Sequence, residues 1–231
     1  FFFKQKTAYE IYQCDWSSDV CSSDLVATNR EYVTWTGELD GVPVSVTSTG
    51  IGCPSAAIAL EELVRVGADT FIRVGTSGHI QKDIKSGDLA IITAAIRDEG
   101  TSKHYMPIEF PAVADIDLVM ALQRAAKKTG ARSRTGITQS KDSFYGQHEP
   151  ARMGVGPDLL NRWKAWEIGG ALCSEMEASA LFVIASMLRV RAGGVMMVHG
   201  VDPMPPLDIL LDTAVQGLRE IIAEDKASGR L

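Results

Sequence analysis

The chain has 231 residues, of which 45% are hydrophobic, and a formal net charge of −6. This mild acidity gives no electrostatic reason to expect a nucleic acid or an anionic membrane as a partner, and no apolar run approaches the length of a membrane span. The length suits a single domain with one good core.

The first 25 residues are excluded from the fold prediction. Within residues 1–25, the strings KQKTAYEI and DWSSDVCSSDL resemble the conceptual translation of a sequencing adapter. We therefore predict an artefactual tail followed by one domain at residues 26–231, with an unusual native tail as the alternative. The tail holds two Lys and four acidic residues, which leaves 21 basic and 25 acidic residues and a charge of −4 for the domain. Cys53 and Cys173 are then the remaining cysteines, which fits a reducing cytosol and predicts a cytoplasmic protein.

Strand and helix patterns alternate along the rest of the chain. Apolar or alternating runs predict strands, helical spacing predicts helices, and an Asp-Gly pair at residues 40–41 predicts a hairpin turn. In chain order, we expect strands at 31–38 and 42–48, a helix from 54 to near 67, strands at 70–74 and 89–96, a helix at 115–128, a strand at 135–139, helices at 158–167 and 177–189, a strand at 194–198 and a helix at 207–223. This order indicates an α/β fold with a central mixed sheet flanked by helices.

Residues 48–63, STGIGCPSAAIALEEL, join a valine-rich strand to a helix through a glycine turn. The two glycines permit backbone angles that a Cβ would forbid, and Pro54 suits the first turn of a helix. Unpaired N–H groups at such a helix start favour polar or anionic ligands. The stretch resembles the signature of the nucleoside phosphorylase family, with matching residues Ser48, Gly50, Gly52, Pro54, Ser55, Ile58, Glu62 and Leu63. The string KHYMPIEFPAVAD (103–115) is similar to a segment of uridine phosphorylases within that family.

Arg73 and Thr76 belong to the string FIRVGTSG, which predicts a strand that ends in a glycine-rich turn at 75–78. Open α/β sheets bind ligands at such strand ends, where the turn could form an anion nest. From the residues alone, Arg73 fits equally a phosphate ligand and a structural partner of a carboxylate. The resemblance implies phosphate binding by both residues. Arg30 by itself is a surface charge, but the resemblance implies that it reaches the phosphate of a neighbouring subunit.

Glu175, Met176 and Glu177 stand where a strand is expected to become a helix. Acidic residues there are favourable with the helix dipole, and burying two carboxylates requires partners. The alternative is a ribose clamp, because a carboxylate can accept hydrogen bonds from two neighbouring hydroxyls. The family has the same Glu-Met-Glu string. It implies that Glu177 holds the ribose hydroxyls, that Met176 packs against the sugar and that Glu175 belongs to the same subsite.

Residues 143–147, SFYGQ, follow an expected strand. Phe144 could stack on a flat base and the Gln147 amide could pair with its polar edge, or the two could be an ordinary aromatic contact and a surface amide in a loop. The resemblance to the uridine phosphorylase base-binding loop implies base binding. The chain departs from that loop in lacking its Pro and its Arg, so strict uracil specificity and a broader base specificity both stay open.

The resemblance implies phosphorolysis of uridine to uracil and ribose 1-phosphate. Inorganic phosphate is the co-substrate, and no metal or organic cofactor is expected. Self-association, as a hexamer built from three dimers, is implied as well. Within the family the alternative is a purine nucleoside phosphorylase. Outside it, a dinucleotide-binding module lacks support because residues 50–52 are not followed by the third spaced glycine. Family members also begin with a strand and a phosphate-contacting loop that we do not find here, so an inactive truncated fragment is a further possibility.

Overall fold

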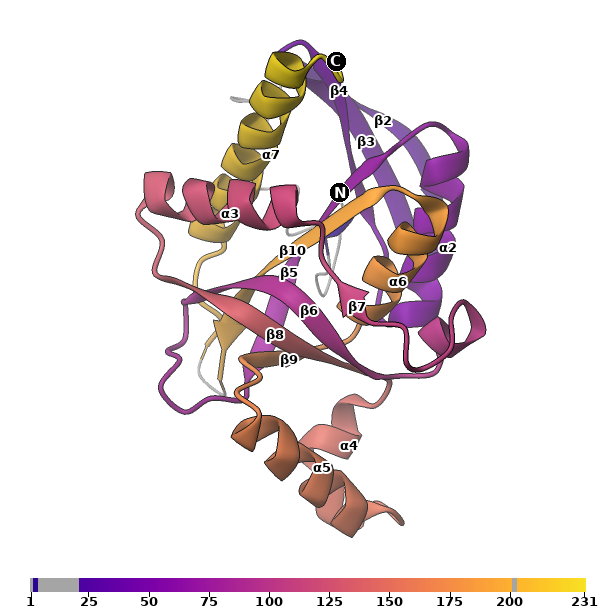
Figure 1. The fold of residues 1–231 in the computed structure, drawn as a ribbon, viewed down its shortest axis with the longest axis vertical. Coiled ribbons are helices and arrows are strands. Elements are labelled where there is room, and N and C mark those ends of the chain that lie inside the picture. Colours follow the sequence, from indigo (N-terminus) through magenta and orange to yellow (C-terminus); the bar gives the residue numbers. More distant parts are fainter. Residues whose placement is uncertain (1, 4–20, 201–202) are drawn as a thin grey trace.

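The computed structural model describes residues 2–3, 21–200 and 203–231. Its described strands form one ten-stranded mixed sheet with helices on both faces (Figure 1). The strands are β1 (Phe2–Phe3), β2 (Cys21–Asn29), β3 (Tyr32–Leu39), β4 (Val42–Ser48), β5 (Thr70–His79), β6 (Leu89–Asp98), β7 (Ala112–Val113), β8 (Ser133–Lys141), β9 (Cys173–Glu175) and β10 (Arg191–His199). The α-helices are α2 (Cys53–Arg65), α3 (Ile116–Thr129), α4 (Phe144–His148), α5 (Gly156–Ile168), α6 (Ala178–Leu188) and α7 (Asp208–Ser228), and short 3-10 helices are η2 (Thr101–His104) and η3 (Pro150–Arg152).

Part of the sheet closes on itself. The strand order is β10-β6-β8-β9-β5-β1-β4-β3-β2, and β10 also pairs with β5. Five strands, β10, β6, β8, β9 and β5, therefore form a ring. β1, β4, β3 and β2 extend the sheet beyond β5, and β7 pairs with β6. β10 runs parallel to β5 and antiparallel to β6, so the sheet is mixed as the sequence predicts.

Local sequence signals explain several element boundaries. Asp40 and Gly41 both have positive φ (51° and 79°), as a two-residue hairpin turn requires, and they join β3 to β4 as predicted. At the start of α3, Asp115 Oδ1 accepts hydrogen bonds from the backbone N–H groups of Asp117 (3.0 Å) and Leu118 (3.2 Å). Gly130 ends that helix in the left-handed conformation.

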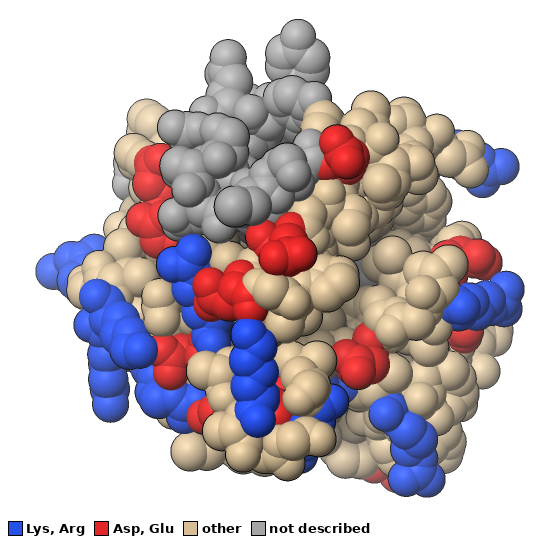
Figure 2. Space-filling model, turned by 90° about the horizontal axis from the view of Figure 1, so that it is seen from above, with Lys and Arg blue, Asp and Glu red and all other residues tan. Residues whose placement is uncertain are grey.

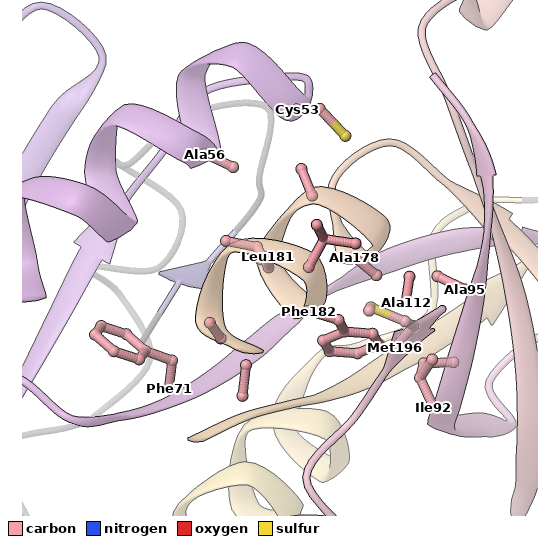
Figure 3. Close-up of a cluster of buried hydrophobic side chains, with 14 of the residues drawn as sticks. Cys53, Ala56, Phe71, Ile92, Ala95, Ala112, Ala178, Leu181, Phe182 and Met196 are labelled. Atoms are coloured by element: carbon pink, nitrogen blue, oxygen red, sulfur yellow. The ribbon is translucent and has the colours of Figure 1, made fainter. Parts of the chain in front are cut away.

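Two apolar clusters fill the space between the sheet and its helices. Alternate residues of each strand point to opposite faces, so Met196 of β10 joins one cluster while Val195 and Met197 join the other. The first cluster packs α2 and α6 against the sheet, and Figure 3 shows Leu181 and Phe182 of α6 within it. The second packs α3 and α7 against the opposite face. α4 and α5 project away from this body (Figure 1).

The structure differs from the sequence expectation at β5. The predicted turn at 75–78 is wrong, because β5 continues to His79 and pairs with β10 as far as Gly78. The glycine-rich anion nest expected there is therefore absent from this described segment. Gly78 lies close to a neighbouring side chain, because a Cβ added there would be 3.5 Å from Gln147 Nε2.

At the N-terminus, residues 1 and 4–20 of the expected tail lie outside the described residues. β2 begins at Cys21, four residues before the expected end of the tail, and pairs with β3. Phe2 and Phe3 pair in parallel with both β4 and β5. The tail boundary at Leu25 stays a prediction.

On the face shown in Figure 2, acidic and basic side chains are interspersed among uncharged residues.

Candidate active site

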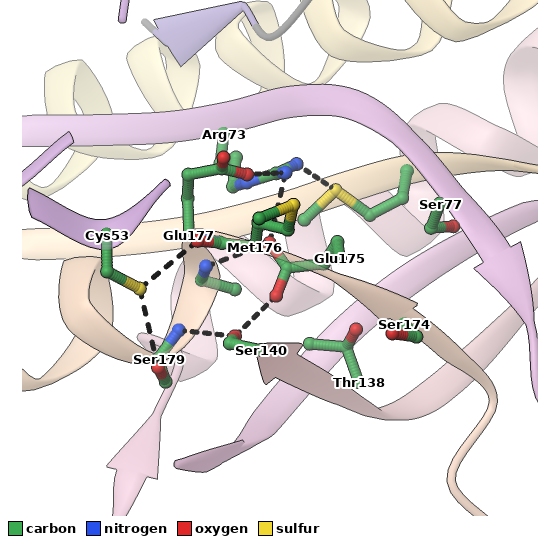
Figure 4. A network of polar contacts seen from close by, with 12 residues as sticks. Cys53, Arg73, Ser77, Thr138, Ser140, Ser174, Glu175, Met176, Glu177 and Ser179 are labelled. Atoms are coloured by element: carbon green, nitrogen blue, oxygen red, sulfur yellow. Dashed lines mark hydrogen bonds and ion pairs between the residues drawn. The ribbon is translucent and has the colours of Figure 1, made fainter. Parts of the chain in front are cut away.

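A buried cluster of one Arg and two Glu side chains occupies the junction of β5, β9 and α6 (Figure 4). Arg73 Nη2 lies 3.0 Å from Glu175 Oε2 and 2.5 Å from Glu177 Oε2. The three side chains are 1%, 0% and 2% exposed. Burial alone would lower the pKa of Arg73, but the carboxylates of Glu175 and Glu177 outweigh it and raise that pKa. The cluster therefore holds a permanent buried cation between two carboxylates.

The glycine turn before α2 contributes directly to this cluster. The backbone N–H of Gly52 donates a 2.6 Å hydrogen bond to Glu177 Oε1. Gly52 has φ of 98°, a conformation that a side chain would strain. Glycine is thus required to aim this N–H at the carboxylate, and the glycine turn and the Glu-Met-Glu string form one site.

Glu175 is fixed from several sides. Its Oε2 accepts hydrogen bonds from the backbone N–H groups of Glu177 (2.8 Å) and Ala178 (2.9 Å) at the start of α6, and its Oε1 accepts one from the Ser140 hydroxyl. Ser140 in turn accepts from the backbone N–H of Ser179 (2.9 Å). These bonds hold the Glu175 carboxylate at the start of α6, where it is favourable with the helix dipole, and leave it little freedom to move.

The remaining residues predicted to bind phosphate or ribose lie outside the Arg73 cluster. Thr76 is half-buried on β5, three residues beyond Arg73, in register with Met197 of β10. The Met176 side chain is 7% exposed, and its backbone oxygen accepts a 3.2 Å hydrogen bond from the Cys53 thiol. Arg30 is exposed in the turn between β2 and β3, with φ of 55°. It takes no part in the Arg73 cluster, so its predicted role requires a neighbouring subunit.

The predicted base-binding residues lie on a short helix rather than in a loop. α4 begins after Ser143, whose Oγ accepts a hydrogen bond from the backbone N–H of Gly146 (2.9 Å). Phe144 is 52% exposed, and its ring lies 4.2 Å from that of His148. The exposed face of Phe144 is therefore available for stacking. Burial, followed by the nearby charges of Lys141 and His199, lowers the pKa of His148, which favours a neutral ring.

Gln147 is held against β9, the strand that carries Glu175. Its Oε1 lies 2.8 Å from the Ser174 hydroxyl, and Lys141 Nζ donates to the same hydroxyl at 2.6 Å. Sequence reasoning missed Gln139, Lys141 and Ser174, all of which are buried. The available signal was a polar string, TQSK, at the end of an expected strand just before the predicted base-binding segment.

A comparison with known protein families shows which family this chain belongs to. A family model described as the phosphorylase superfamily matches residues 20–220. The chain belongs to this superfamily. The match begins six residues before the predicted domain start at residue 26 and includes every residue of the buried Arg–Glu cluster and of α4.

Curated proteins show the same relationship. A uridine phosphorylase from Treponema pallidum is 55% identical over 76% of this chain and 68% of its own length. One from Thermococcus kodakarensis is 51% identical over 73% of this chain, which spans 61% of that relative. A guanosine phosphorylase from Halorubrum lacusprofundi is 41% identical over 79% of this chain and 72% of its own length. The similar proteins thus include enzymes named for a pyrimidine and for a purine nucleoside.

Other features of the described residues bear on ligands and surroundings. Among residues 2–3, 21–200 and 203–231, no three His, Cys, Asp or Glu side chains are placed to hold a metal ion. Within the same ranges, no helix combines the length and apolar character that crossing a bilayer requires. A cavity of about 570 Å³ lies between β4, β5 and α7, and its lining includes Phe71 and Ile222 but none of the charged cluster.

Proposed function

We propose that this protein is a nucleoside phosphorylase that cleaves uridine with inorganic phosphate. The observation that best supports this proposal is the buried cluster of Arg73, Glu175 and Glu177. It places a cation suited to phosphate beside carboxylates suited to sugar hydroxyls. The uridine phosphorylases of Treponema pallidum and Thermococcus kodakarensis support the choice of substrate.

In this proposal Arg73 binds phosphate through a guanidinium group that is already oriented. Its Nε is buried and, among the described residues, has no hydrogen-bond partner. A buried donor without an acceptor is costly, and a phosphate oxygen would satisfy it. Thr76 on the same strand supplies a hydroxyl, and Arg30 of a neighbouring subunit supplies a second cation. The second role requires self-association, which we propose to be hexameric.

Glu177 and Met176 hold the ribose, with Glu175 supporting them from the end of β9. The C1′–N1 bond breaks with both electrons passing to the base nitrogen, and a phosphate oxygen forms the new bond to C1′. The uracil anion then takes a proton from water. Gln147 stabilises negative charge on the departing base, and the ribose contacts contribute orientation. Phosphate is the co-substrate, and the proposed scheme requires no further cofactor. We place the reaction in the cytoplasm.

A purine nucleoside is the second candidate substrate, because the guanosine phosphorylase of Halorubrum lacusprofundi is also a close relative. The absence of an Arg after Gln147 in α4 leaves the base edge less restricted than in the uridine phosphorylase pattern. A single base-binding site would then accept uracil and a purine base through the atoms that the two bases have in common.

The test is phosphate-dependent nucleoside cleavage. Purified protein is incubated with uridine, inosine, guanosine, adenosine or cytidine, with and without phosphate, and the free base is quantified. We expect uracil release only with phosphate, and a large loss of activity in Glu177→Gln with Lys82→Gln as an exposed control. Uracil release at equal rates without phosphate would identify a hydrolase instead. Faster cleavage of a purine nucleoside than of uridine would favour the second candidate.

A further inference from the structure

A buried polar relay connects the middle of the sheet to Gln147. We use the name Ser174 relay for the side chains of Asp98, Gln139, Lys141, Ser174 and Gln147. Ser174 stands opposite Gln139 of β8 and Gly78 of β5 in the sheet register. Gln139 and Ser174 are each 2% exposed, and Lys141 is 7% exposed. Water therefore has little access to these contacts, and the donors and acceptors of the relay must match one another.

The orientation of Gln139 is fixed by Asp98. Gln139 Nε2 donates to Asp98 Oδ2 at 2.8 Å, and Arg162 forms an ion pair with the other carboxylate oxygen. An ionised carboxylate can only accept hydrogen bonds, so the amide nitrogen of Gln139 must face Asp98. Gln139 Oε1 is then left facing the Ser174 hydroxyl at 2.5 Å, where it needs a donor. That donor is the single hydroxyl proton of Ser174.

Lys141 constrains the same hydroxyl from another side. Its ammonium is donor-only and lies 2.6 Å from Ser174 Oγ, so it uses one of the two lone pairs of the hydroxyl. Its charge also repels the hydroxyl proton and directs it toward Gln139. One lone pair of Ser174 remains, and only a donor can use it.

Gln147 occupies that remaining position. With Oε1 at 2.8 Å from Ser174 Oγ, the hydroxyl would have to donate to Gln139 and Gln147 with one proton. Half a turn of the Gln147 amide exchanges Oε1 and Nε2 and satisfies every group, because Nε2 then donates to the free lone pair. Amide orientation in proteins is assigned from such networks. The other end of the amide, now the carbonyl oxygen, lies beside Gly78, where an added Cβ would be only 3.5 Å away.

We propose that the Ser174 relay makes Gln147 present its carbonyl oxygen to the base and thereby selects nucleosides whose base carries a ring N–H. Uracil has such an N–H beside a carbonyl, and so do hypoxanthine and guanine. Cytosine and adenine have an unprotonated ring nitrogen at the corresponding position, which would face another acceptor. Gln139, Lys141 and Ser174 are positioning residues that act through Gln147. This selectivity rests on the proposed phosphorylase function, whereas the amide orientation does not.

Two variants separate this role from a general loss of packing. Ser174→Ala removes the acceptor that anchors Gln147, and Gln139→Met frees the Ser174 proton so that the Gln147 amide can adopt either orientation. Thr138→Val is the matched control, because Thr138 lies on the same strand, is fully buried and donates to Cys173 O rather than to the relay. Thermal unfolding of each variant checks that the fold is retained.

The first measurement is hydrogen exchange of the Gln147 carboxamide in the ligand-free protein, followed by NMR and assigned by its disappearance in Gln147→Ala. We expect protection in the wild type and in Thr138→Val, and exchange at least about 10-fold faster in Ser174→Ala, as loss of a buried hydrogen bond predicts. Equal exchange in the wild type and Ser174→Ala would overturn the relay, whether or not the protein is active.

The second measurement is the ratio of kcat/KM for uridine to that for cytidine. We expect the ratio to fall about 10-fold to 100-fold in Ser174→Ala and Gln139→Met, and to stay unchanged in Thr138→Val. A purely structural effect would lower kcat/KM equally for uridine and cytidine and leave their ratio unchanged. That result would overturn the proposed selectivity but not the proposed phosphorylase function. Faster exchange in Ser174→Ala, without phosphorolysis of any nucleoside by the wild type, would instead support the amide orientation and refute the proposed function.

Discussion

Replacing Arg73 by Met tests how far the buried charge cluster stabilises the fold. The substitution keeps an unbranched apolar side chain but removes the cation that two carboxylates share. Glu175 and Glu177 are 0% and 2% exposed at the side chain, so water cannot replace the lost partner. Removing one side of a buried ion pair costs about 3–5 kcal/mol. For a protein of this size, roughly 2–4 °C per kcal/mol predicts a Tm lower by roughly 6–20 °C.

The assay is urea unfolding of the wild type and Arg73→Met, with Arg124→Met as the control. Arg124 pairs with Glu220 at 3.1 Å, but its side chain is 34% exposed, so its loss should cost less than about 1 kcal/mol. In Arg73→Met the two carboxylates would lose their shared cation while staying buried, so that neutralising them would relieve part of the cost. The destabilisation should therefore shrink as the pH falls from about 8 to about 5. An equal loss of unfolding free energy in the two variants, with no pH dependence, would refute this account of the cluster.

Three further predictions concern other parts of the molecule. Gly217→Ala should destabilise the protein by about 1–3 kcal/mol in urea unfolding, because the new Cβ would lie 2.7 Å from Cδ2 of the fully buried Leu122. An unchanged midpoint would mean that Leu122 can move aside. Burial raises the pKa of the Cys53 and Cys173 thiols, so both should resist iodoacetamide at about pH 8 until the protein unfolds. Peptide mapping by mass spectrometry checks this, and rapid labelling of the native protein would contradict it. Arg30→Ala should raise the KM for phosphate while changing stability by less than about 0.5 kcal/mol. An unaltered phosphate KM would exclude Arg30 from the phosphate site.

Most elements could be predicted from local sequence patterns, because those patterns have local causes. Asp40-Gly41 favours a hairpin turn whatever surrounds it, and α3 begins at an Asp cap and ends at a Gly as its sequence indicates. The continuation of β5 through Gly75 and Gly78 could not be predicted in this way. Its cause is pairing with β10, a strand that lies far away in the sequence.

The residues of the buried Arg–Glu cluster stood out in the sequence, but their arrangement was only partly predictable. The sequence left Arg73 open between a phosphate ligand and a partner of carboxylates, and the structure shows the pairing with Glu175 and Glu177. Phosphate binding by Arg73 stays a prediction. Ser174 gave no signal, and the polar string that contains Lys141 did not indicate a role, because that role depends on β8, β9 and α4 meeting at one point.

The closure of the strand ring has a consequence for how the chain acquires its structure. Arg73 of β5 contacts Met196 of β10, 123 residues later in the sequence. During synthesis, the edge of β5 that β10 will cover stays unpaired until most of the chain has emerged, and contacts of such long sequence separation form slowly. We therefore expect slow refolding, with the proposed substrate-binding groups on β5 and β9 among the last to become ordered. A refolding chain should regain helical content well before it regains nucleoside binding, and the intermediate between these stages should be the species most prone to aggregation.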